Sequence, residues 1–170
     1  FYYYCDSFFV DMLIIKTFGE SEDVANYGAA FRYYSILQVA LIAAQKLLLP
    51  TVAQSEKISE VKTVFSQHKK ISLYLIVLAL PLYLFAVYII TLIDGGKYPD
   101  SVQIFLILAV SAYLSFSFSP YSNVLIKFKR YLFMFVLALI ALLIHIPLSY
   151  YLFSYQGSFG VALSNLLVYG

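Results

Sequence analysis

The feature that most constrains this chain is a long run without a charged residue, ISLYLIVLALPLYLFAVYIITLI, from Ile71 to Ile93. An α-helix rises about 1.5 Å per residue, so roughly 20 predominantly apolar residues are needed to cross about 30 Å of bilayer hydrocarbon. A second run of this kind, from Tyr131 to Phe153, carries only His145. Because the chain is also 62% hydrophobic, more than a soluble domain of its length can bury, we predict that it spans a membrane.

The other apolar stretches predict further spans. One covers residues 102–125, and a more polar one covers residues 27–53. The terminal stretches, residues 1–17 and 158–170, are short for a bilayer and touch the two ends of the sequence. We therefore expect an all-α integral membrane protein, a polytopic bundle of about six transmembrane helices in a single domain, residues 1–170. The apolar ends also predict a piece of a longer chain, cut within two helices.

Basic residues gather in alternate loops of this predicted bundle. Segment 54–70 and turn 126–130 hold most of them, namely Lys57, Lys62, Lys69, Lys70, Lys127, Lys129 and Arg130. The opposite loops hold only Lys16 and Lys97, beside several acidic residues. The positive-inside rule therefore places segment 54–70 and turn 126–130 in the cytoplasm, and the acidic loop GESEDVANYG outside or in the periplasm.

Polar side chains within the predicted spans are the candidates for a functional site. They are Asp6, Asp11, Arg32, Gln38, Gln45 and His145. A charge at bilayer depth costs roughly 2.5 to 3.5 kcal/mol, so such a side chain usually finds a partner or faces a wet cavity. Counted from helix ends near Thr17 and Tyr27, Asp11 and Arg32 lie at similar depths of about 8 to 9 Å, which predicts that they pair.

The same count places Asp6 and Gln38 each about 16 Å deep, which predicts a second contact. Arg32, Ser35, Gln38 and Gln45 also recur at helical spacing and predict a polar stripe turned away from lipid. The predicted Asp11–Arg32 pair would either stabilise the packing of two helices or form part of a cavity that contacts substrate.

His145 stands two residues before Pro147, and a proline frees a backbone carbonyl one turn earlier. One expectation is that His145 bonds a freed carbonyl, and the alternative is a proton relay or a ligand contact. The sequence carries no nucleophile-elbow, zinc-protease or phosphate-loop motif. Its single cysteine, Cys5, belongs to no metal-binding pattern. We therefore expect no catalytic residue, no cofactor and no metal.

Two quoted stretches carry a family resemblance. FFVDMLIIKTFG followed by VANYGAAFRYYSILQVALIAAQKLLLPTVAQ resembles the middle of bacterial polysaccharide flippases of the Wzx type, within the multidrug/oligosaccharidyl-lipid/polysaccharide exporter superfamily. SNVLIKFKRY and GSFGVALSNLL resemble later parts of the same layout, the second through a G-x-x-G-x-A pattern. The positions that match the family pattern are Asp11, Gly19, Val24, Tyr27, Ala30 and Pro50.

The resemblance implies that this chain is most of the C-terminal lobe of a two-lobe transporter of about twelve helices. Its partners would be the bilayer, the N-terminal lobe of the same chain and a lipid-linked oligosaccharide substrate. Its activity would be to flip polyprenyl-pyrophosphate-linked oligosaccharide across the bacterial inner membrane by alternating access, for O-antigen, capsule or exopolysaccharide synthesis. Arg32 would then contact the anionic part of the substrate.

Two other functions stay open on the sequence. One is a cation-coupled exporter of small molecules, in which Asp6 or Asp11 binds the coupling proton or sodium ion. The other is a membrane-embedded transferase of envelope assembly, for which the cytoplasmic segment offers only His68 and Glu60.

Overall fold

The computed structural model describes the backbone of residues 2–54 and 58–169, and the side chains within these ranges except those of residues 2–7, 47–54, 58–61, 76, 78–80 and 82. The described residues form helices and no strand. In chain order the helices are α1 (Tyr2–Phe18), α2 (Ser21–Gln54), α3 (Ile58–Asp94), α4 (Ser101–Lys127) and α5 (Tyr131–Tyr169). The prediction of an all-α chain is therefore confirmed.

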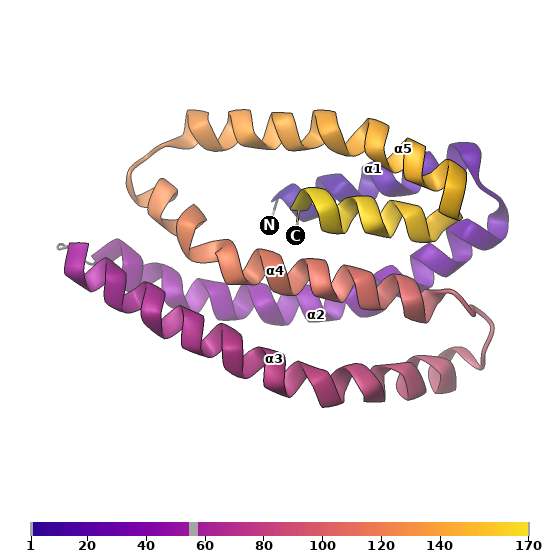
Figure 1. Ribbon diagram of the computed structural model, residues 1–170, viewed down its shortest axis with the longest axis horizontal. Coiled ribbons are helices and arrows are strands. Elements are labelled where there is room, and N and C mark those ends of the chain that lie inside the picture. The colour runs from indigo at the N-terminus through magenta and orange to yellow at the C-terminus, as the bar shows by residue number, and fades with distance from the viewer. Residues whose placement is uncertain (1, 55–57, 170) are drawn as a thin grey trace.

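Helix α5 consists of two helical halves that run in opposite directions. At Gly157 the backbone has φ 60° and ψ −145°, a conformation open essentially to glycine alone. Figure 1 shows the first half along one side of the molecule and the second half returning between it and α4. The predicted stretches 131–153 and 158–170 therefore lie on the two sides of this reversal, as the sequence analysis separated them.

The two halves of α5 approach each other closely beyond the turn. A Cβ atom at Gly160 would overlap the carbonyl oxygen of Leu152, so this position accepts only glycine without a shift of the backbone. Asp23 ties the reversal to the start of α2, because its carboxylate accepts from the backbone N–H of Glu20 at 3.2 Å and of Ser158 at 3.4 Å. A carboxylate near a helix N-terminus is also favoured by the helix dipole.

The hydrophobic core lies between α1, α2, α4 and the second half of α5. Helix α2 packs most extensively on α4, and α3 lies at the edge of the molecule against α4 (Figure 1). The fully buried members of the core are contributed by all four segments, namely Ile15, Tyr27, Ala30, Tyr34, Ile104, Leu108, Ala112, Val161 and Ala162. Small residues on α2, α4 and α5 let the backbones of these helices approach one another.

The outer faces are strongly apolar. Helices α4 and α5 are long and apolar enough to cross a membrane by length and composition, and α3 contains a shorter apolar segment, Tyr83–Asp94, among the described residues. On the first half of α5, Leu132, Phe135 and Leu143 are each more than half exposed. Exposed apolar surface of this extent suits contact with lipid or with another protein surface. The other predicted spans remain predictions.

The predicted helix boundaries differ from the structure mainly at the ends of α2 and α3. Helix α2 starts at Ser21 rather than near Tyr27, and it continues past Pro50 to Gln54. Helix α3 starts at Ile58, so most of the lysine-rich segment 54–70 is the first part of this helix. This fits the expectation that the segment begins as an amphipathic stretch at the interface better than the alternative of a solvated loop. Pro81, Pro120 and Pro147 lie inside helices, which membrane helices tolerate when neighbours satisfy the freed carbonyls.

Candidate functional site

A fully buried carboxylate forms the centre of the candidate site. Asp11 on α1 accepts hydrogen bonds from the hydroxyl of Tyr27 at 2.5 Å, from Nε2 of His145 at 2.8 Å and from Nδ2 of Asn165 at 3.0 Å. All four side chains are buried. Three donors around two carboxylate oxygens suit the ionised form, which only accepts. We call these four residues the Asp11 cluster.

The Asp11 cluster joins every helical segment that surrounds it. Asp11 and Tyr27 are equally far along the chain from Gly19, which follows the end of α1, so two adjacent antiparallel helices bring them to the same level. His145 comes from the first half of α5 and Asn165 from the second half. The cluster therefore holds α1, α2 and both halves of α5 in one arrangement.

A second layer of polar groups lies beside His145. Ser149 Oγ is 3.4 Å from His145 Nδ1, too long for a strong hydrogen bond, and Ser149 bonds Ser164 across the two halves of α5. Ser164 in turn donates to the carbonyl of Val161 at 2.7 Å. The ring of Tyr169 stands edge-on to the imidazole, with 5.0 Å between ring centroids. The histidine is thus enclosed by side chains of its own helix and by Asp11.

Asn165 of the Asp11 cluster and Asn26, which precedes Tyr27 in the sequence, each carry a buried acceptor atom without a partner among the described residues. Within the part of the chain that the structure describes, Oδ1 of Asn165 and Oδ1 of Asn26 accept no hydrogen bond. A buried unpaired carbonyl oxygen is costly, by about 1 to 3 kcal/mol, and such atoms usually bind water or a ligand. Asn165 also bonds Asp11 through its Nδ2, so an unpaired acceptor and a carboxylate belong to the same group of side chains.

The predicted pairing of Asp11 with Arg32 is wrong. The side chain of Asp11 contacts His145, whereas Arg32 is exposed on α2. The depth count began α2 at Tyr27, but the helix begins at Ser21, which moves Arg32 about 9 Å further along the helix than assumed. The α2 residue level with Asp11 is Tyr27, and Arg32 lies beyond it.

The predicted polar stripe on α2 divides between two surfaces. Gln38 is buried and donates from Nε2 to the hydroxyl of Tyr34 on the same helix, while Ser35 and Gln45 are half-buried. Arg32 lies on an exposed face that also carries Ile36, Val39 and Lys46. The side chain of Asp6 is outside the described residues, so its predicted contact with Gln38 stays a prediction.

His145 does not bond a carbonyl freed by Pro147, because its Nε2 faces Asp11. The arrangement expected there occurs instead between α3 and α4. Nε2 of the buried His68 donates to the carbonyl oxygen of Phe116 at 3.0 Å. Phe116 stands four residues before Pro120, which has no N–H to offer that carbonyl. The histidine therefore supplies the donor that the proline lacks.

Sequence reasoning missed Tyr27 and Asn165 as members of the site. A cavity of about 430 Å³ beside His68, bordered by Lys69, Ser72 and Tyr121, was not expected either. Asn165 lies in an apolar stretch without a charge, and its contact with Asp11 depends on the reversal of α5. The sequence could have predicted Tyr27, because Asp11 and Tyr27 lie at equal distances along the chain from the short turn between α1 and α2.

These observations define an all-α protein with a buried contact between Asp11 and His145, which joins its first and last helices, and with two helices suited to crossing a membrane. Within the described residues, no group of His, Cys, Asp and Glu side chains is arranged to hold a metal ion. Comparison of the chain with family models, with curated proteins and with solved structures finds no match.

Proposed function

We propose that the chain is one lobe of a membrane translocase, with about six transmembrane segments when the halves of α5 are counted separately. Its substrate is a polyprenyl-pyrophosphate-linked oligosaccharide of envelope polysaccharide synthesis. It moves this substrate across a bacterial inner membrane by alternating access between this lobe and a second one. The sequence motifs that resemble polysaccharide flippases support this class of substrate. The exposed position of Arg32 supports a substrate site on this face of the bundle.

Arg32 lies within a predicted span and yet points out of this bundle. It is exposed, and within the described residues it has no ion-pair partner. An unpaired arginine facing hydrocarbon is unfavourable, so a cation in this position is expected to face a wet cavity or another part of the protein. In a two-lobe transporter, that cavity lies between the lobes and holds the substrate. A guanidinium there can bind phosphate oxygens through two parallel hydrogen bonds.

The face that carries Arg32 supports this proposal. Ile36, Val39 and Ala43 follow it at helical spacing, all exposed, and Lys46 ends the row near the predicted cytoplasmic side. An apolar strip between two cations matches a substrate with an anionic group and a long apolar chain. The Asp11 cluster lies inside the bundle, where it holds the helices that bear this face.

The test uses the full-length protein reconstituted in liposomes with a fluorescent polyprenyl-pyrophosphate oligosaccharide. Transport is measured as the fraction of fluorophore that a membrane-impermeant quencher reaches over time. Arg32→Ala is expected to slow transport at least tenfold, and Arg32→Lys to retain part of it, since lysine keeps the charge but not the bidentate geometry. Lys16→Ala, an exposed cation on α1, serves as the matched control. Transport at the wild-type rate by Arg32→Ala would overturn the role of this residue, and no transport by the wild type would overturn the proposed function.

A second candidate is a cation-coupled exporter, and the Asp11 cluster favours it. Ionisable side chains buried within membrane helices mark ion pathways and proton relays, and Asp11 and His145 are both buried and in contact. The unpaired oxygen of Asn165 would suit a bound cation as well. Dependence of small-molecule efflux on a proton or sodium gradient, lost in Asp11→Asn, supports this function. Efflux that ignores both gradients would exclude it.

A further inference from the structure

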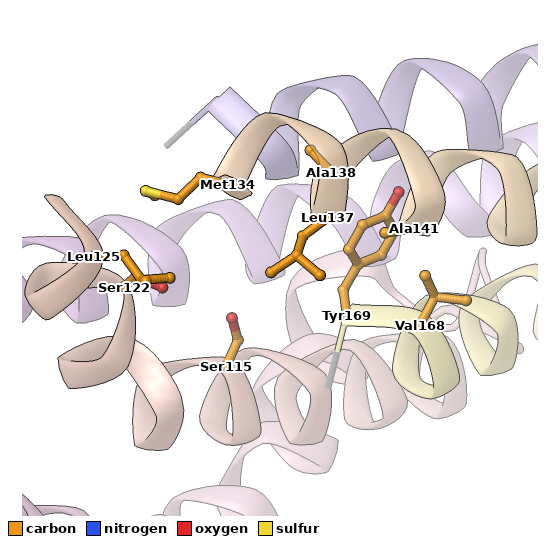
Figure 2. A pocket seen from close by; sticks show the side chains of 9 residues that line it. All are labelled: Ser115, Ser122, Leu125, Met134, Leu137, Ala138, Ala141, Val168 and Tyr169. Carbon is orange, nitrogen blue, oxygen red and sulfur yellow. The ribbon is translucent and has the colours of Figure 1, made fainter. Parts of the chain in front are cut away.

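A groove between α4 and α5 is not used by either proposed function. Figure 2 shows the side chains around it, which come from α4, from the first half of α5 and from the end of the second half. We call it the α4–α5 groove. Most of its lining is apolar and consists of Leu125, Met134, Leu137, Ala138, Ala141 and Val168. Its volume is about 250 Å³, and it is open on one side rather than enclosed.

The shape of the α4–α5 groove follows from two local features. Pro120 lies inside α4, and the end of α4 bends away from its earlier course as it approaches α5 (Figure 1). On the facing side, Ala138 and Ala141 leave space where larger side chains would fill it. A volume of this size is below the roughly 300 to 1,000 Å³ that encloses a drug-sized molecule. The groove therefore fits a segment of a chain that continues outside it.

A basic turn closes one end of the α4–α5 groove. The backbone N–H of Arg130 bonds the carbonyl of Leu125 at 3.0 Å, and the carbonyl of Arg130 accepts from the N–H of Met134 at 3.2 Å. Leu125 and Met134 both line the groove, so the turn that carries Lys127, Lys129 and Arg130 is attached directly to its walls. Lys129 and Arg130 are exposed.

The charges of Lys129 and Arg130 have no acidic residue on α4 or α5 to balance them. From residue 101 to residue 170 the sequence contains no aspartate and no glutamate. The predicted topology places the turn on the cytoplasmic side, where the leaflet carries anionic lipids. Exposed apolar side chains such as Leu132 and Phe135 flank the same end of α5. Cations at an interface beside an apolar groove match the two parts of one lipid molecule.

We infer that the α4–α5 groove is a binding site for an anionic phospholipid of the cytoplasmic leaflet. One acyl chain lies along Leu137, Ala138 and Ala141, and the phosphate is bound by Lys129 and Arg130. An arginine and a lysine next to each other give one planar donor pair and one flexible point charge for phosphate oxygens. The inference requires that α4 and α5 lie in a membrane, but not that the protein is a translocase.

The experiment is photo-crosslinking of the full-length protein in nanodiscs. The probe is phosphatidylglycerol with a diazirine at the end of one acyl chain, and the labelled residues are identified by mass spectrometry. Labelling is expected within residues 134–141 of α5 and 122–125 of α4. The neutral probe, phosphatidylcholine with the same diazirine, is expected to label these peptides several-fold less.

Two variants separate the groove from the charges. Ala138→Trp fills the groove and should abolish labelling there, whereas Leu139→Trp, on the exposed neighbouring position, should leave it unchanged. Lys129→Gln combined with Arg130→Gln should weaken labelling at subsaturating probe by about fivefold for each cation removed. Lys97→Gln in the loop between α3 and α4 is the control for a charge change elsewhere. Size-exclusion profiles verify that each variant is folded.

Several outcomes would overturn the inference. Undiminished labelling in Ala138→Trp would place the acyl chain elsewhere, and equal labelling by both lipids would remove the role of the cations. Loss of labelling on addition of polyprenyl phosphate would assign the groove to the translocated lipid rather than to a phospholipid. Labelling of only the exposed face of α5 would contradict the lipid site in the groove but agree with the placement of α5 in a membrane. Labelling of neither the groove nor the exposed face of α5 would contradict both the lipid site and the membrane placement.

Discussion

Asp11 and His145 lie 134 residues apart in the sequence, and their side chains meet at 2.8 Å with no exposed surface on either. This contact joins the first helix to the last one. Removing one of two buried hydrogen-bonded side chains leaves the other without its partner, which costs more free energy than the hydrogen bond itself contributes. We therefore expect this contact to contribute to the stability of the bundle.

The Asp11–His145 contact predicts non-additive effects of mutation. Asp11→Asn and His145→Leu are each expected to lower the free energy of unfolding, because each leaves a buried polar group with fewer partners. The double variant should lose less than the sum, with a coupling free energy of about 1 to 3 kcal/mol. The measurement is equilibrium unfolding of the full-length protein in detergent micelles. Additive losses would contradict a direct contact.

Tyr27→Phe tests the shortest hydrogen bond of the Asp11 cluster. The substitution keeps the ring in the core and removes only the hydroxyl that donates to Asp11. Hydrogen bonds to charged groups contribute about 1.5 to 3 kcal/mol, so the free energy of unfolding should fall by an amount in this range. Tyr74→Phe, on an exposed side chain of α3, is the control and should have almost no effect. Equal effects of the two changes would refute the contact.

The reversal of α5 predicts opposite responses at two glycines. Gly160→Ala should destabilise the protein by more than about 2 kcal/mol, because the new methyl group overlaps the carbonyl oxygen of Leu152. Gly28→Ala is the matched control, since a Cβ there meets nothing within 4 Å. In a helix, that change should stabilise by up to about 1 kcal/mol. Thermal unfolding of the two variants side by side gives the comparison, and similar melting temperatures would contradict the close approach.

The pairing of His68 with Phe116 predicts a rescue. His68→Leu leaves the carbonyl of Phe116 without a donor and should cost about 1 to 3 kcal/mol. Pro120→Ala restores a backbone N–H that can bond this carbonyl, so His68→Leu should cost clearly less in that background. The check is the free energy of unfolding of the two single variants and the double variant. An equally large loss in both backgrounds would show that His68 acts through packing alone.

The helices were predictable because long apolar runs determine them with little help from tertiary contacts. The charge-free run Ile71–Ile93 lies within α3, and the reversal at Gly157 lies between the two predicted apolar stretches, 131–153 and 158–170. The start of α2 was not predictable from hydrophobicity. Its first turn, from Ser21, is polar, and the side chain of Asp23 begins the helix by bonding the N–H of Glu20.

The candidate site was predictable in part. Asp11 and His145 stood out because charged or titratable groups are rare in apolar spans, but their contact needs the return of α5 across the bundle. The predicted start of α2 was six residues too late in the sequence. The predicted depth of Arg32 was therefore wrong, and so was its pairing with Asp11. Asn165 has no distinguishing neighbour in the sequence, so only the fold brings it to Asp11.

The order of synthesis gives the Asp11 cluster a consequence for assembly. Asp11 leaves the ribosome 154 residues before Asn165, the last of its partners. At a synthesis rate of about 5 to 20 residues per second, roughly 8 to 30 seconds pass between the synthesis of Asp11 and that of Asn165. Until His145 is made, 134 residues after Asp11, Tyr27 is the one donor of the cluster that has been synthesised. A ribosome stalled before His145 therefore holds a chain whose first helix carries an incompletely paired acid.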